Sequence, residues 1–81
     1  MQLILEKRAI KELDKIPTPL VKTILEKIEL LANESKTNQA KRLRNSPLYR
    51  LRVGDYRIIY YPDYRKNLLI VLKIAHRSKV Y

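Results

Sequence analysis

The spacing of apolar residues changes once along this chain, and that change constrains the fold more than any other feature. Over residues 7–34, apolar side chains recur every three or four positions, which is the spacing of one face of a helix. Beyond residue 47 they alternate with polar side chains, as in a strand with one buried face. Such a chain is expected to pack its helices on one face of an antiparallel sheet.

The first half of the sequence predicts a short strand followed by two helices. Gln2–Glu6 is apolar enough for a strand, and Lys7–Ile16 carries apolar residues at helical spacing. A proline-rich break then separates the helices, with Thr18 as the expected N-cap and Pro19 at the first helical position. The second helix is predicted over Leu20–Glu34, because its apolar residues form one stripe.

The second half of the sequence predicts three strands. Leu48–Val53 and Tyr56–Tyr61 alternate on either side of Gly54-Asp55, a pair that favours a two-residue type II′ turn. Pro62 is expected to end the second of these strands, before a polar turn. Leu68–Ile74 is almost continuously apolar, which predicts a central strand covered on both faces.

The predicted fold class is therefore α+β, in a single domain over residues 1–81. We expect an N-terminal strand, a two-helix hairpin and a three-stranded antiparallel meander, with the helices on one face of a small, mostly antiparallel sheet. Residues 35–47 are expected to be a polar, basic connection. The absence of cysteine excludes disulfides and thiolate zinc sites, and no apolar run approaches membrane-spanning length. We expect a cytoplasmic protein with no cofactor, no metal and no membrane partner.

The positive charge of the chain lies almost entirely in its second half. The formal net charge is +10, from 18 basic and 8 acidic residues. Residues 1–35 hold equal numbers of basic and acidic side chains, so the excess belongs to residues 36–81. A surface that repels itself in this way usually meets a polyanion. Nucleic acid is the leading partner class, and an acidic protein or a membrane surface is the alternative.

The predicted hairpin gathers arginines on one face of the sheet. Arg50 and Arg52 point to the same face, and the two-residue turn places Arg52 opposite Arg57. Like charges directly across a sheet are unfavourable, so stability alone does not explain the arrangement. A bound phosphate would explain it, because the planar guanidinium matches phosphate oxygens. The alternative is a solvated face whose arginines extend into water.

The C-terminal residues include the chain's one histidine. A histidine at a strand end is most often structural or solvated, and a role of His76 in proton transfer is the alternative. Arg77 is expected to join the arginines of the hairpin if the last strand lies beside it. Strand alternation directs His76 and Arg77 to opposite faces.

Two motifs behind the two helices resemble those of the RelE/ParE toxin superfamily, and specifically of RelE-like ribosome-dependent mRNA endonucleases. The first is Leu48–Tyr60, read as LYRLRVGDYRIIY, and the second is His76-Arg77-x-x-Val80-Tyr81. The resemblance covers nearly the whole chain. It implies a toxin that enters the ribosomal A site, where the 2′-OH of mRNA attacks the adjacent phosphate. The products would be a 2′,3′-cyclic phosphate and a free 5′-OH.

The resemblance also implies roles for individual residues. Arg57 resembles the arginine that clamps the scissile phosphate, and Arg77 the residue placed as leaving-group acid or second clamp. Tyr81 resembles the tyrosine that stacks on a base or orients the nucleophile. Arg50 and Arg52 stand where the best-known members carry lysines; because guanidinium stays protonated, we expect them to stabilise charge rather than act as a base. His76 or ribosomal RNA would then supply the base. The residues expected to bind RNA are Lys41, Arg42, Arg44, His76 and Lys79.

The resemblance implies three partners: a cognate acidic, RelB-like antitoxin, the ribosome with its rRNA, and mRNA. Two alternative functions share the predicted features. One is a ParE-like poison of DNA gyrase with the same fold, and the other is a non-catalytic RNA-binding domain. The ending His76-Arg77-x-x-Val80-Tyr81 favours RNA cleavage.

Overall fold

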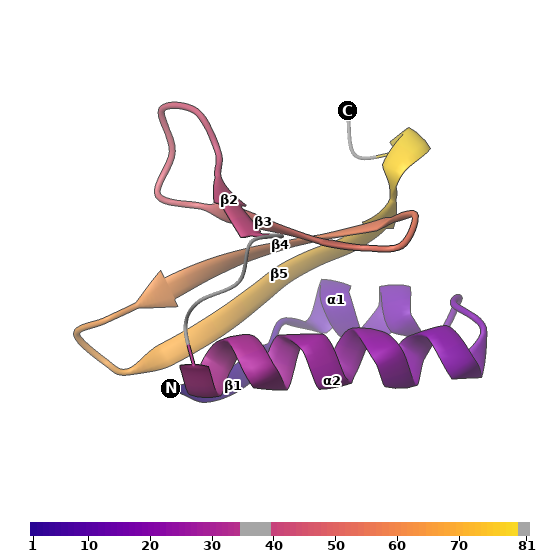
Figure 1. Ribbon diagram of the computed structural model, residues 1–81, viewed down its shortest axis with the longest axis horizontal. Coiled ribbons are helices and arrows are strands. Elements are labelled where there is room, and N and C mark those ends of the chain that lie inside the picture. Colours follow the sequence, from indigo (N-terminus) through magenta and orange to yellow (C-terminus); the bar gives the residue numbers. More distant parts are fainter. Residues whose placement is uncertain (35–39, 80–81) are drawn as a thin grey trace.

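The computed structural model describes residues 1–34 and 40–79. Within these residues, two helices cover one face of a five-stranded sheet (Figure 1). The predicted α+β class, with helices on one face, is confirmed. The elements are β1 (Gln2–Leu5), α1 (Lys7–Leu13), α2 (Thr18–Glu34), β2 (Ala40–Arg42), β3 (Tyr49–Val53), β4 (Tyr56–Asp63), β5 (Leu68–His76) and the 3₁₀ helix η1 (Arg77–Lys79).

The sheet is mostly antiparallel, as predicted, and its strand order is β1-β5-β4-β3-β2. Strands β2 to β5 pair antiparallel in sequence order, while β1 pairs parallel with β5. The N-terminal strand therefore lies beside the last strand, from Gln2 opposite Leu68 to Leu5 opposite Val71. Neither helix in the described part of the chain has the length and apolar character needed to cross a bilayer.

The predicted hairpin register is confirmed. Val53 pairs with Tyr56 across the turn, and Arg52 lies opposite Arg57. Gly54 has a φ of 57°, which L side chains rarely adopt and which a type II′ turn requires at its first central position. Glycine is therefore needed at position 54. The two-residue turn then fixes the register that places Arg52 opposite Arg57.

Strand β4 does not end at Pro62, contrary to the prediction. It continues to Asp63, and Pro62 is buried opposite Leu69 of β5. The pairing of β3 with β4 stops at Tyr60, so beyond that residue β4 pairs with β5 alone among the described strands. A proline that lacks an N–H is tolerated there, because no ladder bond on the β3 side needs it.

The connection predicted over residues 35–47 contains a strand that the sequence did not indicate. Three residues, Ala40–Arg42, pair with β3 at the edge of the sheet. Three residues are too few to show alternation, and two of them are basic. The strand forms because β3 has an unpaired edge beside it. That edge is known only once the sheet has been assembled.

The boundaries of the helices differ from the prediction by two or three residues. Helix α1 ends at Leu13, and α2 begins at Thr18 rather than Leu20. The Pro17 carbonyl accepts the amide hydrogens of Leu20 and Val21, at 2.9 and 3.1 Å. Thr18 is therefore already helical, and the residue before it takes the capping position predicted for Thr18.

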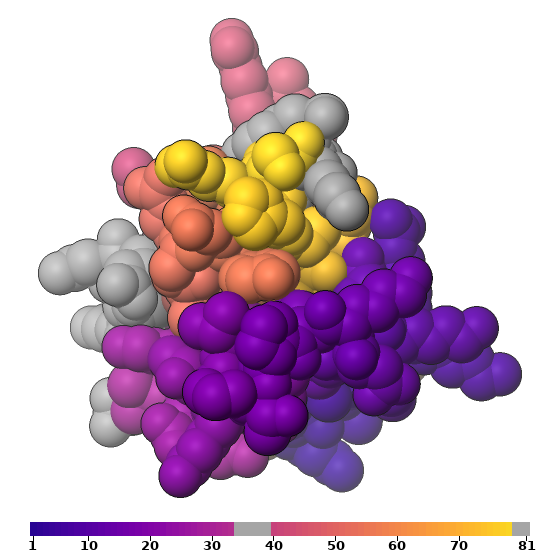
Figure 2. All heavy atoms as spheres, turned by 90° about the vertical axis from the view of Figure 1, so that its right-hand side faces the viewer, coloured from indigo at the N-terminus to yellow at the C-terminus, as the bar shows by residue number. Residues whose placement is uncertain are grey.

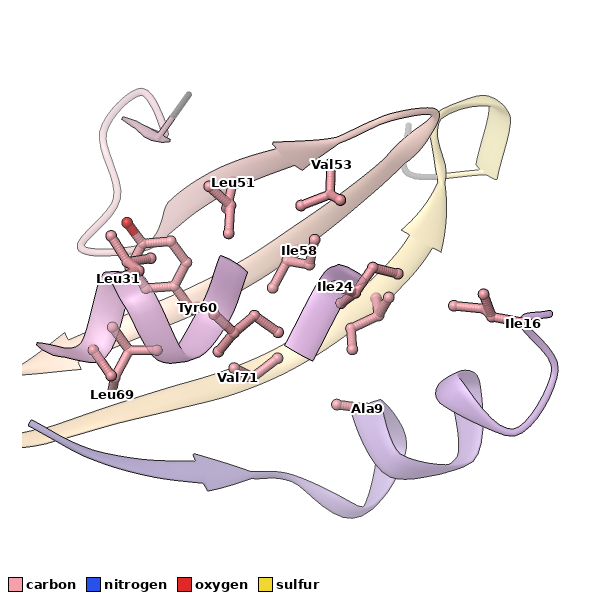
Figure 3. Close-up of a cluster of buried hydrophobic side chains, with 13 residues drawn as sticks. Ala9, Ile16, Ile24, Leu31, Leu51, Val53, Ile58, Tyr60, Leu69 and Val71 are labelled. Atoms are coloured by element: carbon pink, nitrogen blue, oxygen red, sulfur yellow. The ribbon is translucent and has the colours of Figure 1, made fainter. Parts of the chain in front are cut away.

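The hydrophobic core lies between the helices and the sheet (Figure 3). Ala9 is fully buried, and its small side chain lets α1 approach β5 closely. Glu12 strengthens this contact, because its Oε1 accepts the backbone N–H of Ile74 at 2.8 Å. The largest fully buried side chains are Ile24, Ile28, Leu51, Ile58, Val71 and Ile74.

The face of the sheet opposite the helices, called the helix-free face below, is not covered by any element in residues 1–34 and 40–79 (Figure 1). Within the described residues, strand β5 is therefore central in the sheet but covered on one face only, which corrects the prediction of two covered faces. Leu69, Val71 and Ile74 are buried, whereas Ile70 and Leu72 are only half-buried. The continuous apolar run of β5 therefore includes half-buried side chains on the helix-free face.

A buried tyrosine makes stability depend on pH above 10. Tyr60 stacks on Tyr49 with ring centroids 5.6 Å apart. Burial, and next the neighbouring phenols of Tyr49 and Tyr64, raise the pKa of Tyr60 from 10.0 to about 12. The unfolded chain loses this proton first, so the contribution is fully present below pH 10 and is lost as pH rises towards 12.

We expect wild type to lose about 2–3 kcal/mol more stability than Tyr60→Phe between pH 9 and pH 12. Urea denaturation at both pH values measures the difference, and the Phe variant accounts for every other group that titrates there. Equal pH dependence in the two proteins would show that the folded state does not hold the Tyr60 proton.

Candidate functional site

Three arginines of the β3–β4 hairpin lie on the helix-free face. Leu51 and Val53 are buried towards the helices, so alternation directs Arg50 and Arg52 to the other side. Arg57 follows the same rule, because its neighbour Ile58 is fully buried towards the helices. The structure thus brings these three predicted residues together on one face.

Strand β2 adds a fourth cation to this group. Lys41 is registered opposite Arg50, on the same face. We call Lys41, Arg50, Arg52 and Arg57 the arginine face. Arg42 lies outside it, because it alternates to the other side of β2 and its Nε donates to the Ser46 carbonyl at 2.9 Å. Arg44 is exposed in the turn after β2 and also lies outside.

The arginine face has cationic or apolar neighbours across the strands. One row runs from Lys41 through Arg50 and Ile59 to Lys73. Arg50 and Arg57 are half-buried, while Arg52 is exposed. No carboxylate occupies the registered positions next to these side chains, so the face presents concentrated positive charge to an anion.

The second row of the face places two guanidinium groups directly opposite each other. Arg52 pairs with Arg57, and Ala75 follows on β5. Like charges across a strand pair destabilise a sheet. We therefore expect Arg52→Thr to raise the free energy of unfolding by about 0.5 kcal/mol, because threonine suits a strand and removes the repulsion.

Urea denaturation at low and high salt tests this gain. An electrostatic gain shrinks as salt screens the pair, so a gain that is constant with salt, or a loss of stability, would contradict the expectation. Arg65→Thr, at an exposed position in the β4–β5 turn, is the matched control.

Arg77 lies at the tip of the hairpin, immediately after β5. Its backbone N–H donates to the Asp55 carbonyl at 2.7 Å, and its Nε lies 3.9 Å from Asp55 Oδ1. Figure 2 shows the C-terminal residues of the described chain beside the hairpin tip, at one end of the molecule. The last strand does lie beside the hairpin, as the prediction for Arg77 required. Arg77 itself belongs to η1, where an exposed ion pair holds it.

His76 lies away from the arginine face. Alternation places it on the side opposite Ala75, and its ring meets the ring of Tyr56 edge-on at 5.5 Å. Its Nδ1 accepts the backbone N–H of Ser78 at 3.4 Å and lies 3.0 Å from Ser78 Oγ. His76 is thus fixed by local contacts. Lys79 ends η1, and Tyr81 lies outside the described residues.

Sequence reasoning did not propose Lys73 as a site residue. The half-buried Lys73 is registered opposite Ile59, at the β5 end of the first cationic row. Alternation along the last strand does place it on the same face as Ala75 and Arg77. The pairing of β5 with β4 is what makes its position significant.

The sequence matches one family described as the ParE toxin of type II toxin-antitoxin systems, parDE, over residues 3–81. A protein of Methanocaldococcus jannaschii described as a candidate toxin, RelE1, is 33% identical to this chain. The match covers 95% of this chain and 90% of that protein.

Solved structures of similar fold include toxins bound to their antitoxins. The RelE–RelB complex of Pyrococcus horikoshii gives a TM-score of 0.83 at 26% identity, covering 98% of this chain and 97% of the other. The RelB–RelE complex of Methanococcus jannaschii gives 0.79 at 26% identity, covering 96% and 94%. The intact RelBE complex of E. coli gives 0.80 at 20% identity, covering 93% and 94%, and supports the fold alone.

Proposed function

Because the chain belongs to the RelE/ParE superfamily of toxins from type II toxin–antitoxin systems, we propose that it is an endoribonuclease that cleaves mRNA in the ribosomal A site and so inhibits translation. The observation that carries the proposal is the arginine face, where Arg52 and Arg57 oppose each other although the sheet would be more stable without the pair. A phosphodiester bound between them would relieve this repulsion.

The proposed reaction is a transesterification within one RNA strand. The 2′ oxygen forms a bond to the adjacent phosphorus as the bond from phosphorus to the 5′ oxygen breaks. The products are a 2′,3′-cyclic phosphate and a 5′-OH. Negative charge builds on the phosphoryl oxygens in the transition state, and fixed guanidinium donors are suited to stabilise it. Arg57 would clamp the phosphate, with Arg50 and Arg52 beside it.

The base that deprotonates the 2′-OH is proposed to come from ribosomal RNA. Guanidinium groups stay protonated, so the arginines of the face cannot accept this proton. His76 points to the opposite side of β5. The requirement for an external base also gives a reason for dependence on the ribosome, which would orient the message as well.

Arg77 is proposed as a second phosphate clamp rather than the leaving-group acid, because its guanidinium gives up a proton very reluctantly. The leaving 5′ oxygen is proposed to take its proton from water or from ribosomal RNA. Arg77 would have to leave Asp55, which costs little because an exposed ion pair contributes at most about 1 kcal/mol. Tyr81 is proposed to stack on a base. Three further cations are proposed to contact the RNA backbone: the exposed Arg42 and Arg44, and Lys79.

We further propose a cognate acidic, RelB-like antitoxin as the resting partner in the cytoplasm. The related toxins named above were solved in complexes with RelB. The net charge of +10 favours an acidic protein in the absence of RNA.

Primer extension on mRNA from cells that express the protein tests the proposal. Discrete breaks inside codons of translated messages are expected, and drugs that keep ribosomes off the message should abolish them. The family description as ParE favours one alternative, a gyrase poison. Intact mRNA with an induced DNA-damage response would establish that alternative, and RNA binding without breaks would leave a non-catalytic domain.

A further inference from the structure

A hollow of about 360 Å³ lies where α1 meets the C-terminal end of β5. Beyond Val71, β5 has no strand on its outer side among the described residues, and α1 takes the place of one. Six of the side chains that line the hollow matter here: Arg8, Glu12, Lys15, Tyr56, Lys73 and His76. We call it the α1–β5 hollow. Its volume falls in the range of small-molecule sites and exceeds what a single phosphate ion needs.

The charges around the hollow favour an anion. Arg8 and Lys15 approach from α1 and the turn after it, and Lys73 approaches from β5. The carboxylate Glu12 is already engaged, because it accepts the Ile74 N–H at 2.8 Å and lies 3.8 Å from Arg8. Glu12 therefore offsets the charge of Arg8, while Lys15 and Lys73 add positive charge to the hollow.

Two rings line the hollow beside the aliphatic side chains of Ile16, Ile74 and Ala75. Tyr56 and His76 meet edge-on with centroids 5.5 Å apart. The contacts of His76 Nδ1 with Ser78 hold the imidazole in this position beside Tyr56. Cations beside a ring wall are the features that proteins use to hold one nucleotide of a single strand, with the phosphate on the cations and the base against the rings.

The hollow borders the two rows of the arginine face at β5, because one residue of each row also lines it. Lys73 ends the first cationic row of that face and also lines the hollow. Ala75 lies opposite Arg57 and lines the hollow as well. An RNA strand leaving the arginine face across β5 therefore meets the hollow next.

We propose that the α1–β5 hollow binds one nucleotide of the RNA strand whose neighbouring phosphate lies on the arginine face. Lys15 and Lys73 contact its phosphate, and Tyr56 and His76 contact its base. This subsite rests on the proposed function, and it would give the toxin a means of reading the base beside the cleavage point. It also gives a role to Arg8 and Lys15, two cations of the charge-balanced first half of the chain that line the hollow.

Binding of an RNA that cannot be cleaved tests the subsite. The probe is a fluorescent octamer of 2′-O-methyluridine, which lacks the nucleophile, and its anisotropy is measured from 0.1 to 1 M salt. Lys15→Ala/Lys73→Ala is compared with Lys11→Ala/Lys22→Ala, a control with the same loss of charge at exposed positions that do not line the hollow. Loss of the contacts to this one phosphate predicts a salt slope smaller by about 0.7 and affinity about 5-fold weaker at 0.1 M salt.

The imidazole of His76 gives an independent readout, because it is the chain's one histidine and its NMR signals need no assignment. They should shift when the octamer is added to wild type and shift little in Lys15→Ala/Lys73→Ala. Equal loss of affinity in both double variants, or unmoved His76 signals in wild type, would overturn the subsite. Equal shifts with hexaglutamate would also overturn it and make the hollow a site for acidic peptide.

The subsite and the proposed function fail in different ways. If the octamer binds as predicted but wild type leaves mRNA intact on ribosomes, the nuclease proposal fails and the hollow remains an RNA site. If wild type cleaves mRNA but the Lys15→Ala/Lys73→Ala variant binds the octamer normally, the subsite fails and the nuclease stands.

Discussion

Arg57→Ala is expected to slow mRNA cleavage on translating ribosomes by about 10²–10³-fold, the usual effect of removing one preorganised donor to a transition-state anion. Arg57 lies in the second row of the arginine face, opposite Arg52 and beside Ala75 of β5. Its side chain points away from the core, so the variant should fold as wild type does. Single-turnover cleavage of a labelled message measures the rate, and circular dichroism checks the fold.

Two further variants separate the causes of this loss. Arg57→Lys keeps the charge but loses the planar fork, so we expect it to recover only part of the rate. Arg65→Ala removes an exposed arginine from the β4–β5 turn at the far end of the same strand, and its rate should stay within about twofold of wild type. A normal rate in Arg57→Ala, or an equal loss in Arg65→Ala, would remove the arginine face from the mechanism.

Ile28→Asp is expected to abolish folding. Ile28 is fully buried in the core between α2 and the sheet. The substitution removes a large apolar side chain and buries a carboxylate without a partner, at a combined cost of about 5 kcal/mol or more. A domain of this size has little stability beyond that. The variant should show no cooperative thermal transition and no toxicity.

The control lies two residues away on the same helix. Leu30 is 48% exposed, so Leu30→Asp should cost less than about 1 kcal/mol and keep a cooperative transition. If Leu30→Asp unfolds the protein as well, the account of which face of α2 is buried is wrong. If Ile28→Asp folds and unfolds cooperatively near the wild-type temperature, the core assignment is wrong.

Local patterns were sufficient to predict the hairpin and its consequences. Gly54-Asp55 fixes a two-residue turn, and that turn alone places Arg52 opposite Arg57. Alternation along Leu48–Val53 identified the buried and exposed faces of β3 correctly. These features depend on residues that are close in sequence, so they can be read without knowing the rest of the fold.

Features that depend on distant partners could not be predicted in this way. Ala40–Arg42 becomes a strand only because β3 leaves its edge free. Pro62 continues β4 only because β3 has already ended beside it. The apolar run of β5 indicated burial on both faces, but how many faces are covered depends on where the helices pack.

The candidate site shows the same division. The three arginines of the arginine face were predicted from alternation and the turn. Placing Lys41 in this face, and Lys73 at the end of its first row, required the pairings of β2 and β5. The α1–β5 hollow joins residues more than fifty positions apart, and the sequence contains no local pattern that connects them.

The most direct measurement of the central claim is the chemistry of the cut ends. Purified translating ribosomes stalled on a defined message are incubated with the protein, and the fragments are examined by mass spectrometry. If guanidinium groups of the arginine face hold the scissile phosphate, wild type should give a 2′,3′-cyclic phosphate and a 5′-OH within the A-site codon, and Arg57→Ala should give neither at a comparable rate. An intact message with wild-type protein at concentrations that arrest growth would contradict the claim.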